Sequence, residues 1–157
     1  MGRAVYPLPP GSRPSVQAPG GKPGARLYLG RWQDTLESVT DCHLLLSDPP
    51  YSERTHKGYK TARDLTIAGV EYAAITPDQC REFADHWLPR VSGWVVLFCD
   101  HYSFRTWEEV ITAAGWYVFA PVVWWPSAPA PRLQGDGPAC GGEHLIVARP
   151  RKRPQTW

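Results

Sequence analysis

Apolar residues fall into blocks of two kinds along the chain, and the two kinds alternate. Mostly apolar runs of strand length recur at 43–47, 93–99, 116–125 and 144–148. Between them, 77–88 and 103–114 carry their apolar residues at the spacing of one face of a helix. Strands that alternate with helices predict a three-layer α/β domain with a largely parallel sheet.

The ends of these blocks carry their own signals. Thr76-Pro77-Asp78 is typical of a helix start, with Thr as N-cap and Pro in the first helical position. Gly115 is expected to end the second helix. Pro121 indicates an edge position or a bulge, because proline cannot donate a ladder hydrogen bond. We therefore expect 117–124 to pair antiparallel with 144–148 at the edge of the sheet.

The N-terminal part is less regular. Residues 26–30 predict a short strand and 34–39 a short helix. Residues 1–25 hold six Pro and five Gly without apolar periodicity, which is typical of a flexible leader. The expected organisation is a disordered leader over 1–25, one α/β domain over 26–149 and a basic tail over 150–157.

Composition adds few constraints. The chain is 43% hydrophobic and 20% charged, as in ordinary globular proteins, and its net charge of +2 permits a nucleic-acid partner without arguing for one. No segment approaches the about 20 apolar residues that cross a bilayer, and no signal peptide is recognisable. We therefore expect a cytoplasmic protein without membrane contact. The spacing of the four Cys and five His predicts no metal site.

The apolar run at 43–47 leads directly into Asp48-Pro49-Pro50-Tyr51. Such a run favours a central parallel strand covered on both faces, and the prolines turn the chain out of the sheet at its carboxyl end. Ligands gather at that end in parallel α/β sheets. The motif resembles the signature of the amino-group (N6-adenine / N4-cytosine) DNA methyltransferase family. A plain proline turn after a buried strand is the alternative.

The motif has a chemical rationale. An aromatic amine is a poor nucleophile, because its lone pair is delocalised into the ring. The Asp48 carboxylate and the Pro49 carbonyl can each accept one N–H of the amine, which directs its lone pair at a methyl donor. The prolines, Pro50 included, stiffen the turn, and Tyr51 offers a flat face to a base turned out of the duplex.

The resemblance extends over residues 26–157 and points to a subgroup often encoded by phages and bacteria. The segments that carry it are Leu27-Tyr28-Leu29-Gly30, Ser52-Glu53, His56, 94–100, 135–139, 142–148 and 149–153. It implies a Rossmann-like methyltransferase sheet, S-adenosylmethionine as cofactor, DNA as partner and a role such as restriction-modification. In this subgroup, Asp rather than Ser before the prolines is more often associated with methylation of adenine N6 than of cytosine N4.

The resemblance also implies a cofactor half, in which a strand ends in an acidic, aromatic and glycine-rich turn. No such turn follows a strand in this chain, and Asp48 and Asp100 are the candidates for cofactor contact. Asp100 is equally suited to cap the second helix. A second polypeptide can complete the site, the chain can be a relative without turnover, or it can bind the cofactor in a reduced way.

Other polar residues are candidates for DNA contact. Ser52, His56, Lys57 and Lys60 follow the motif and suit phosphate binding, although a solvated loop explains them equally. Arg151, Lys152 and Arg153 can neutralise phosphates without reading sequence. For Trp124-Trp125 we expect core packing of at least one ring.

Three functions remain open from the sequence. The first is DNA methylation, by the chain itself or as the catalytic-motif subunit of a split enzyme. The second is a non-catalytic nucleic-acid-binding or regulatory remnant of the same fold. The third is a methyltransferase that acts on RNA or protein, because related motifs serve those substrates too.

Overall fold

The computed structural model describes residues 27–55, 73–127 and 141–152. The chain divides into two compact units, Met1–Thr40 and Asp41–Trp157, which are described one at a time. The leader predicted over 1–25 lies outside the described residues. The domain bounds expected from the sequence stay predictions.

The first unit contains one described helix, α1 (Trp32–Thr35). The strand predicted over 26–30 is wrong for residues 27–30, where the structure shows no strand. Backbone groups of a strand need a partner strand, and the described residues of this unit offer none. The helix predicted over 34–39 lies earlier and is shorter, because none of its residues is buried and packing does not extend it.

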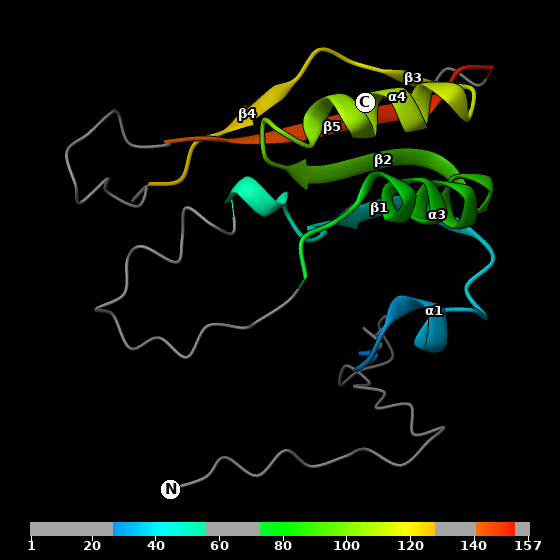
Figure 1. Cartoon of the computed structure of the whole chain (residues 1–157). Coiled ribbons are helices and arrows are strands. Elements are labelled where there is room, and N and C mark those ends of the chain that lie inside the picture. Colours follow the sequence, from blue (N-terminus) through cyan, green and yellow to red (C-terminus); the bar gives the residue numbers. More distant parts are fainter. Residues whose placement is uncertain (1–26, 56–72, 128–140, 153–157) are drawn as a thin grey trace, which may run out of the picture. The chain divides into compact units, whose positions relative to one another are not determined.

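Five strands form the sheet of the second unit (Figure 1). They are β1 (Cys42–Ser47), β2 (Val91–Cys99), β3 (Trp116–Val118), β4 (Val122–Trp124) and β5 (Glu143–Pro150). Their order is β1-β2-β5-β3, and β4 also pairs with β5. β1 and β2 are parallel, whereas β5 is antiparallel to β2, β3 and β4. Four strands therefore run in one direction, and β5 runs between them in the other.

This mixed sheet with helices on one face agrees with the predicted α/β class. The antiparallel pairing predicted for 117–124 with 144–148 is confirmed. Pro121 separates β3 from β4, as expected of a proline in an edge strand. The sheet is less parallel than predicted, because β5 lies inside it and pairs on both sides.

The helices of the second unit that the structure describes over their full length are α3 (Pro77–Trp87), the 3₁₀ turn η1 (Leu88–Arg90) and α4 (Phe104–Ala113). Their predicted starts and stops are confirmed. Thr76 and Gln79 form a reciprocal capping box at the start of α3, where each side chain accepts from the backbone N–H of the other. Gly115 follows α4 with a φ of 83°, a conformation that glycine adopts without strain.

α3 and α4 lie side by side on one face of the sheet (Figure 1), where the Phe83 and Trp107 rings meet edge-on with centroids 5.7 Å apart. Alternate residues of β2 point to this face, and Val95, Leu97 and Cys99 are at most 1% exposed. The described helices of the second unit thus cover one face. The predicted three-layer arrangement is therefore present in part.

β1 lies at the end of the sheet, not at the centre that we expected. Among the described residues it pairs with β2 alone. Leu44 and Leu46, on the face opposite the helices, are 55% and 61% exposed. An apolar run shows what a strand is suited to bury, but its burial depends on which neighbours are present.

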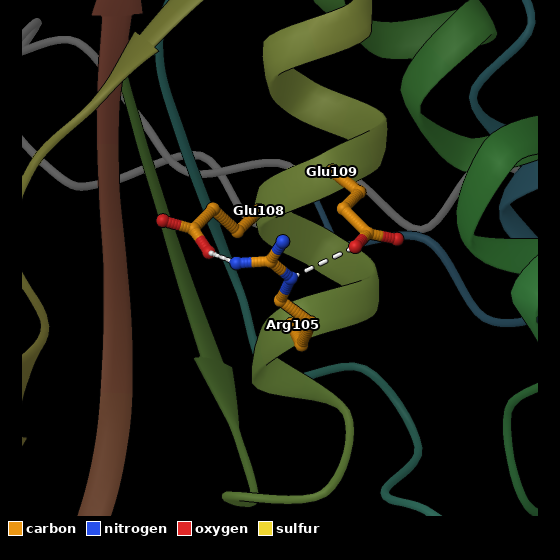
Figure 2. A network of polar contacts seen from close by, with 3 residues as sticks. All are labelled: Arg105, Glu108 and Glu109. Carbon is orange, nitrogen blue, oxygen red and sulfur yellow. Dashed lines mark hydrogen bonds and ion pairs between the residues drawn. The ribbon is translucent and has the colours of Figure 1, made fainter.

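The outer surface of α4 carries a small ionic network (Figure 2). The Arg105 guanidinium contacts Glu108 at 3.4 Å and Glu109 at 2.8 Å, and all three side chains are exposed. Solvent screens such pairs, so they contribute little to stability. This face of the helix is a solvated surface.

Gly93 allows β1 and β2 to approach each other closely. The pairing shifts between Cys42↔Val91 and Leu44↔Trp94, so that β2 has one extra residue at this point. A Cβ on Gly93 would lie 2.2 Å from the backbone oxygen of His43, which cannot move aside as a side-chain tip can. Glycine is therefore required at this β-bulge.

Gly93→Ala is expected to lower the free energy of unfolding by about 1–3 kcal/mol, the usual cost of forcing atoms into packed structure. Urea denaturation followed by tryptophan fluorescence measures this loss. An alanine variant as stable as the wild type would show that β1 and β2 do not approach each other as described.

Candidate functional site

Asp48-Pro49-Pro50-Tyr51 follows Ser47, the last residue of β1. Asp48 and Pro50 are exposed, Pro49 is buried and Tyr51 is half-buried. The motif therefore lies at the carboxyl end of β1, as predicted. Buried Pro49 anchors the turn, and the Asp48 side chain remains open to a ligand.

Asp100 lies beside the motif, directly after the last residue of β2. Its Oδ2 accepts hydrogen bonds from the backbone N–H of Ser52 at 2.9 Å and from the hydroxyls of Ser52 and Thr55, each at 2.5 Å. Its Oδ1 accepts from the backbone N–H of Ser103 at 2.7 Å and from the Ser103 hydroxyl at 2.6 Å. One carboxylate thus joins the motif segment to the turn that leads into α4.

This environment keeps Asp100 ionised. Burial alone would raise its pKa, but the hydrogen bonds from Ser103, Ser52 and Thr55 outweigh burial and hold the pKa well below its usual range. Of the two roles left open by the sequence, the structure supports the cap in part: Asp100 binds the backbone N–H of Ser103 in the turn ahead of α4, and Ser103 is itself the N-cap residue of the helix. Contact with a cofactor stays a prediction, and it would have to compete with donors already bound to both oxygens.

Tyr51 is held by a residue that our sequence reasoning missed. Its hydroxyl donates to Oε2 of Glu143, the first residue of β5, at 3.1 Å. Because β5 is antiparallel, its first residue lies at the same end of the sheet as the last residues of β1 and β2. The antiparallel strand predicted at 144–148 was the available signal, since it implies that the residue before it lies at this end.

Burial raises the pKa of Tyr51 above its usual range, and the nearby carboxylates of Asp48 and Glu143 raise it further. Tyr51 therefore stays a neutral phenol at physiological pH. A neutral ring that is fixed at its hydroxyl is suited to stacking on another flat group.

The structure brings only some of the other predicted residues to this place. Ser52 is here, whereas His56, Lys57, Lys60 and Arg153 lie outside the described residues. Arg151 and Lys152 are exposed after the other end of β5. At about 3.4 Å per residue, the eight steps from Glu143 to Arg151 separate them from the motif end of the sheet by about 27 Å.

Trp124 and Trp125 lie at the end of the sheet that carries the motif, because Trp124 pairs with Glu143. They are 53% and 71% exposed, so the expected core packing of one ring is wrong. The Trp124 ring contacts Phe98, with centroids 6.2 Å apart. Trp124 is the last residue of β4 and Trp125 follows it, so two exposed indoles lie near Glu143 at this end of the sheet.

The described residues contain no group of His, Cys, Asp and Glu that could hold a metal ion. Cys80 and Cys99 are buried free thiols, and burial raises the pKa of each to about 12. These thiols therefore remain protonated, in keeping with a structural role. No described helix has both the length and the apolar character needed to cross a membrane.

S-adenosylmethionine is the cofactor expected from the resemblance of the sequence. The described residues offer only part of a site for it, namely the exposed Asp48 at the carboxyl end of β1. In the described ranges, no glycine-rich turn follows a strand. These residues do not by themselves fit the whole cofactor.

No family model matches the chain, and no curated protein is found as its relative. Solved structures do resemble it. The M1.HpyAVI–SAM complex matches with a TM-score of 0.51 and 17% identity, over 78% of this chain and 50% of that one. M1.HpyAVI matches with a TM-score of 0.50 and 15% identity, over 78% and 55%. The chain thus has a methyltransferase fold and spans about half the length of these structures.

Proposed function

We propose that this chain is the catalytic-motif part of an S-adenosylmethionine-dependent DNA N-methyltransferase, with adenine N6 as the favoured target. The observation that carries the proposal is the placement of Asp48-Pro49-Pro50-Tyr51 at the carboxyl end of a strand in a methyltransferase fold. In α/β sheets this is the end at which ligands bind.

The described residues suit the substrate side of the reaction. The exposed Asp48 carboxylate and the Pro49 carbonyl would accept the two N–H groups of a base amine and orient its lone pair. Tyr51 would stack on the base, and Trp124 with Trp125 adds aromatic surface at the same end of the sheet. Aromatic faces of this kind hold bases that have left the duplex.

The cofactor would supply the methyl group, and we propose that its binding needs a second α/β part. This part would be a second polypeptide that carries the glycine-rich turn. Two observations support it: the chain matches about half of M1.HpyAVI, and β1 presents Leu44 and Leu46 to solvent at the end of the sheet. Arg151 and Lys152, away from the motif, would add phosphate contacts elsewhere on DNA.

The alternative is a non-catalytic nucleic-acid-binding remnant of the same fold. It is favoured by one observation, the lack of a glycine-rich turn after any described strand. Such a remnant would keep the aromatic and basic surfaces but would not transfer methyl groups in any assembly.

Cofactor binding and methyl transfer test the proposal. Calorimetry of the isolated chain is expected to show no micromolar affinity for S-adenosylmethionine. The chain co-purified with the product of the neighbouring gene is expected to bind it and to methylate duplex DNA. Parallel reactions with RNA and with protein determine the substrate class. Cofactor binding without methyl transfer to any of the three would favour the remnant, and transfer to RNA or protein alone would exclude DNA.

A further inference from the structure

The motif turn is attached to the sheet by two carboxylates that lie outside the motif. We propose that Asp100 and Glu143 are positioning residues, which together form a clasp that fixes the segment 51–55 and with it the catalytic motif. Asp100 binds the segment through Ser52 and Thr55, and Glu143 binds Tyr51. The functional meaning of this clasp rests on the proposed function, although its existence can be tested without catalysis.

The two carboxylates come from neighbouring strands. Cys99 of β2 pairs with His144 of β5, so that Asp100 and Glu143 stand next to each other at the end of the sheet. They differ from the motif in sequence position by about 50 and 90 residues, and the sheet alone brings them together. The motif turn is therefore attached to two neighbouring strands of the sheet.

A proline turn at the end of an edge strand has few contacts of its own. β1 has one partner strand among the described residues, and Asp48 and Pro50 are exposed. Hydrogen bonds to the segment after the motif compensate for this lack of contacts. They matter because acceptors that must be pre-positioned for catalysis can move by much less than 1 Å before the rate falls. Asp100 meets this need with a charged acceptor, which makes shorter and stronger hydrogen bonds than a neutral one.

The two oxygens of Asp100 have separate tasks, and this makes the clasp testable. Oδ2 faces Ser52 and Thr55, whereas Oδ1 faces Ser103 ahead of α4. The double variant Ser52→Ala, Thr55→Val removes hydroxyl donors on the motif side and leaves the α4 side intact. Ser103→Ala does the reverse and is the matched control.

Amide hydrogen exchange of the full chain tests the contacts of Asp100 with Ser52 and Thr55. In the double variant, exchange of the segment 51–55 is expected to rise on the order of tenfold, while α4 stays as protected as in the wild type. Ser103→Ala is expected to leave 51–55 unchanged. Unaltered exchange of 51–55 in the double variant, or an equal rise in α4, would overturn the proposal that Asp100 fixes this segment.

Glu143→Ala and Glu143→Gln test the contact of Glu143 with Tyr51. Glutamine keeps an acceptor for the Tyr51 hydroxyl, so it is expected to preserve the protection of the Ile75 amide, which donates to the Tyr51 carbonyl at 3.1 Å. Alanine is expected to lose that protection several-fold. Equal exchange of the Ile75 amide in the two variants would overturn the proposal that Glu143 fixes Tyr51.

Kinetics of an active assembly show what the clasp does. The double variant and Glu143→Ala are expected to lower kcat about tenfold with little change in KM, and Glu143→Gln is expected to restore kcat. Unchanged kcat with altered exchange would overturn the positioning role. If no assembly methylates, the exchange results still decide whether the clasp exists, so its failure is distinct from failure of the proposed function.

Discussion

Asp48→Ala is expected to abolish methyl transfer by the assembled enzyme, with a loss of at least about 10²–10³-fold in the rate of the chemical step. In the proposed mechanism the carboxylate orients and polarises the amine in the transition state, so its loss is expected to lower the rate of methyl transfer and not the affinity. Asp48 is exposed, and its truncation leaves no cavity in the core. The fold and the affinity for DNA should remain nearly those of the wild type.

A single-turnover assay on a duplex with the target base measures the rate of methyl transfer. Thermal unfolding checks the stability of the fold, and a titration checks the affinity for DNA. Asp85→Ala is the matched control, because Asp85 is an exposed carboxylate on α3 and has no role in the proposed site. An Asp48→Ala protein that methylates at the wild-type rate would remove the motif from the mechanism.

Trp107→Ala is expected to lower the free energy of unfolding by about 3–5 kcal/mol, the usual cost of emptying a large aromatic site in a core. Trp107 is completely buried in α4, and its ring contacts Phe83 of α3. The loss would loosen α4, which begins next to the turn that Asp100 caps. The functional site depends on this part of the core although no atom of Trp107 belongs to it.

Urea denaturation measures the loss, and Trp107→Phe is the control. Phenylalanine keeps most of the ring and removes an indole N–H that has no hydrogen-bond partner among the described residues. Its cost should therefore be much smaller than that of alanine. A loss below about 1 kcal/mol for alanine would contradict the packing described here, given typical costs of core truncation.

Local signals in the sequence predicted the elements around the site. The capping box at Thr76, the stop at Gly115 and the proline turn after β1 each depend on residues close in the chain, and each is confirmed. The same holds for the placement of Asp48 at the carboxyl end of a strand. Short-range stereochemistry determines all of these features.

Features that depend on distant segments are not contained in such local patterns, although the antiparallel strand predicted at 144–148 indicated at which end of the sheet the residue before it lies. Glu143 reaches Tyr51 only because β5 is antiparallel and starts where β1 ends. The exposed leucines of β1 and the missing strand at 27–30 depend on which partner strands are present. No pattern within either segment carries that information.

The extra residue of β2 at Gly93 determines more than the spacing of two strands. Beyond this point each β1 residue pairs with the β2 residue 50 positions later, whereas Cys42 pairs at 49. If the offset of Cys42 continued along the whole pair, the end of β1 would lie about 3.3 Å from its present place along β2, and its side chains would face the opposite sides of the sheet. A displacement of this size is longer than a hydrogen bond, so Ser52 would lose its hydrogen bonds to Asp100. The extra residue of β2 thus sets the register that brings the motif turn to Asp100.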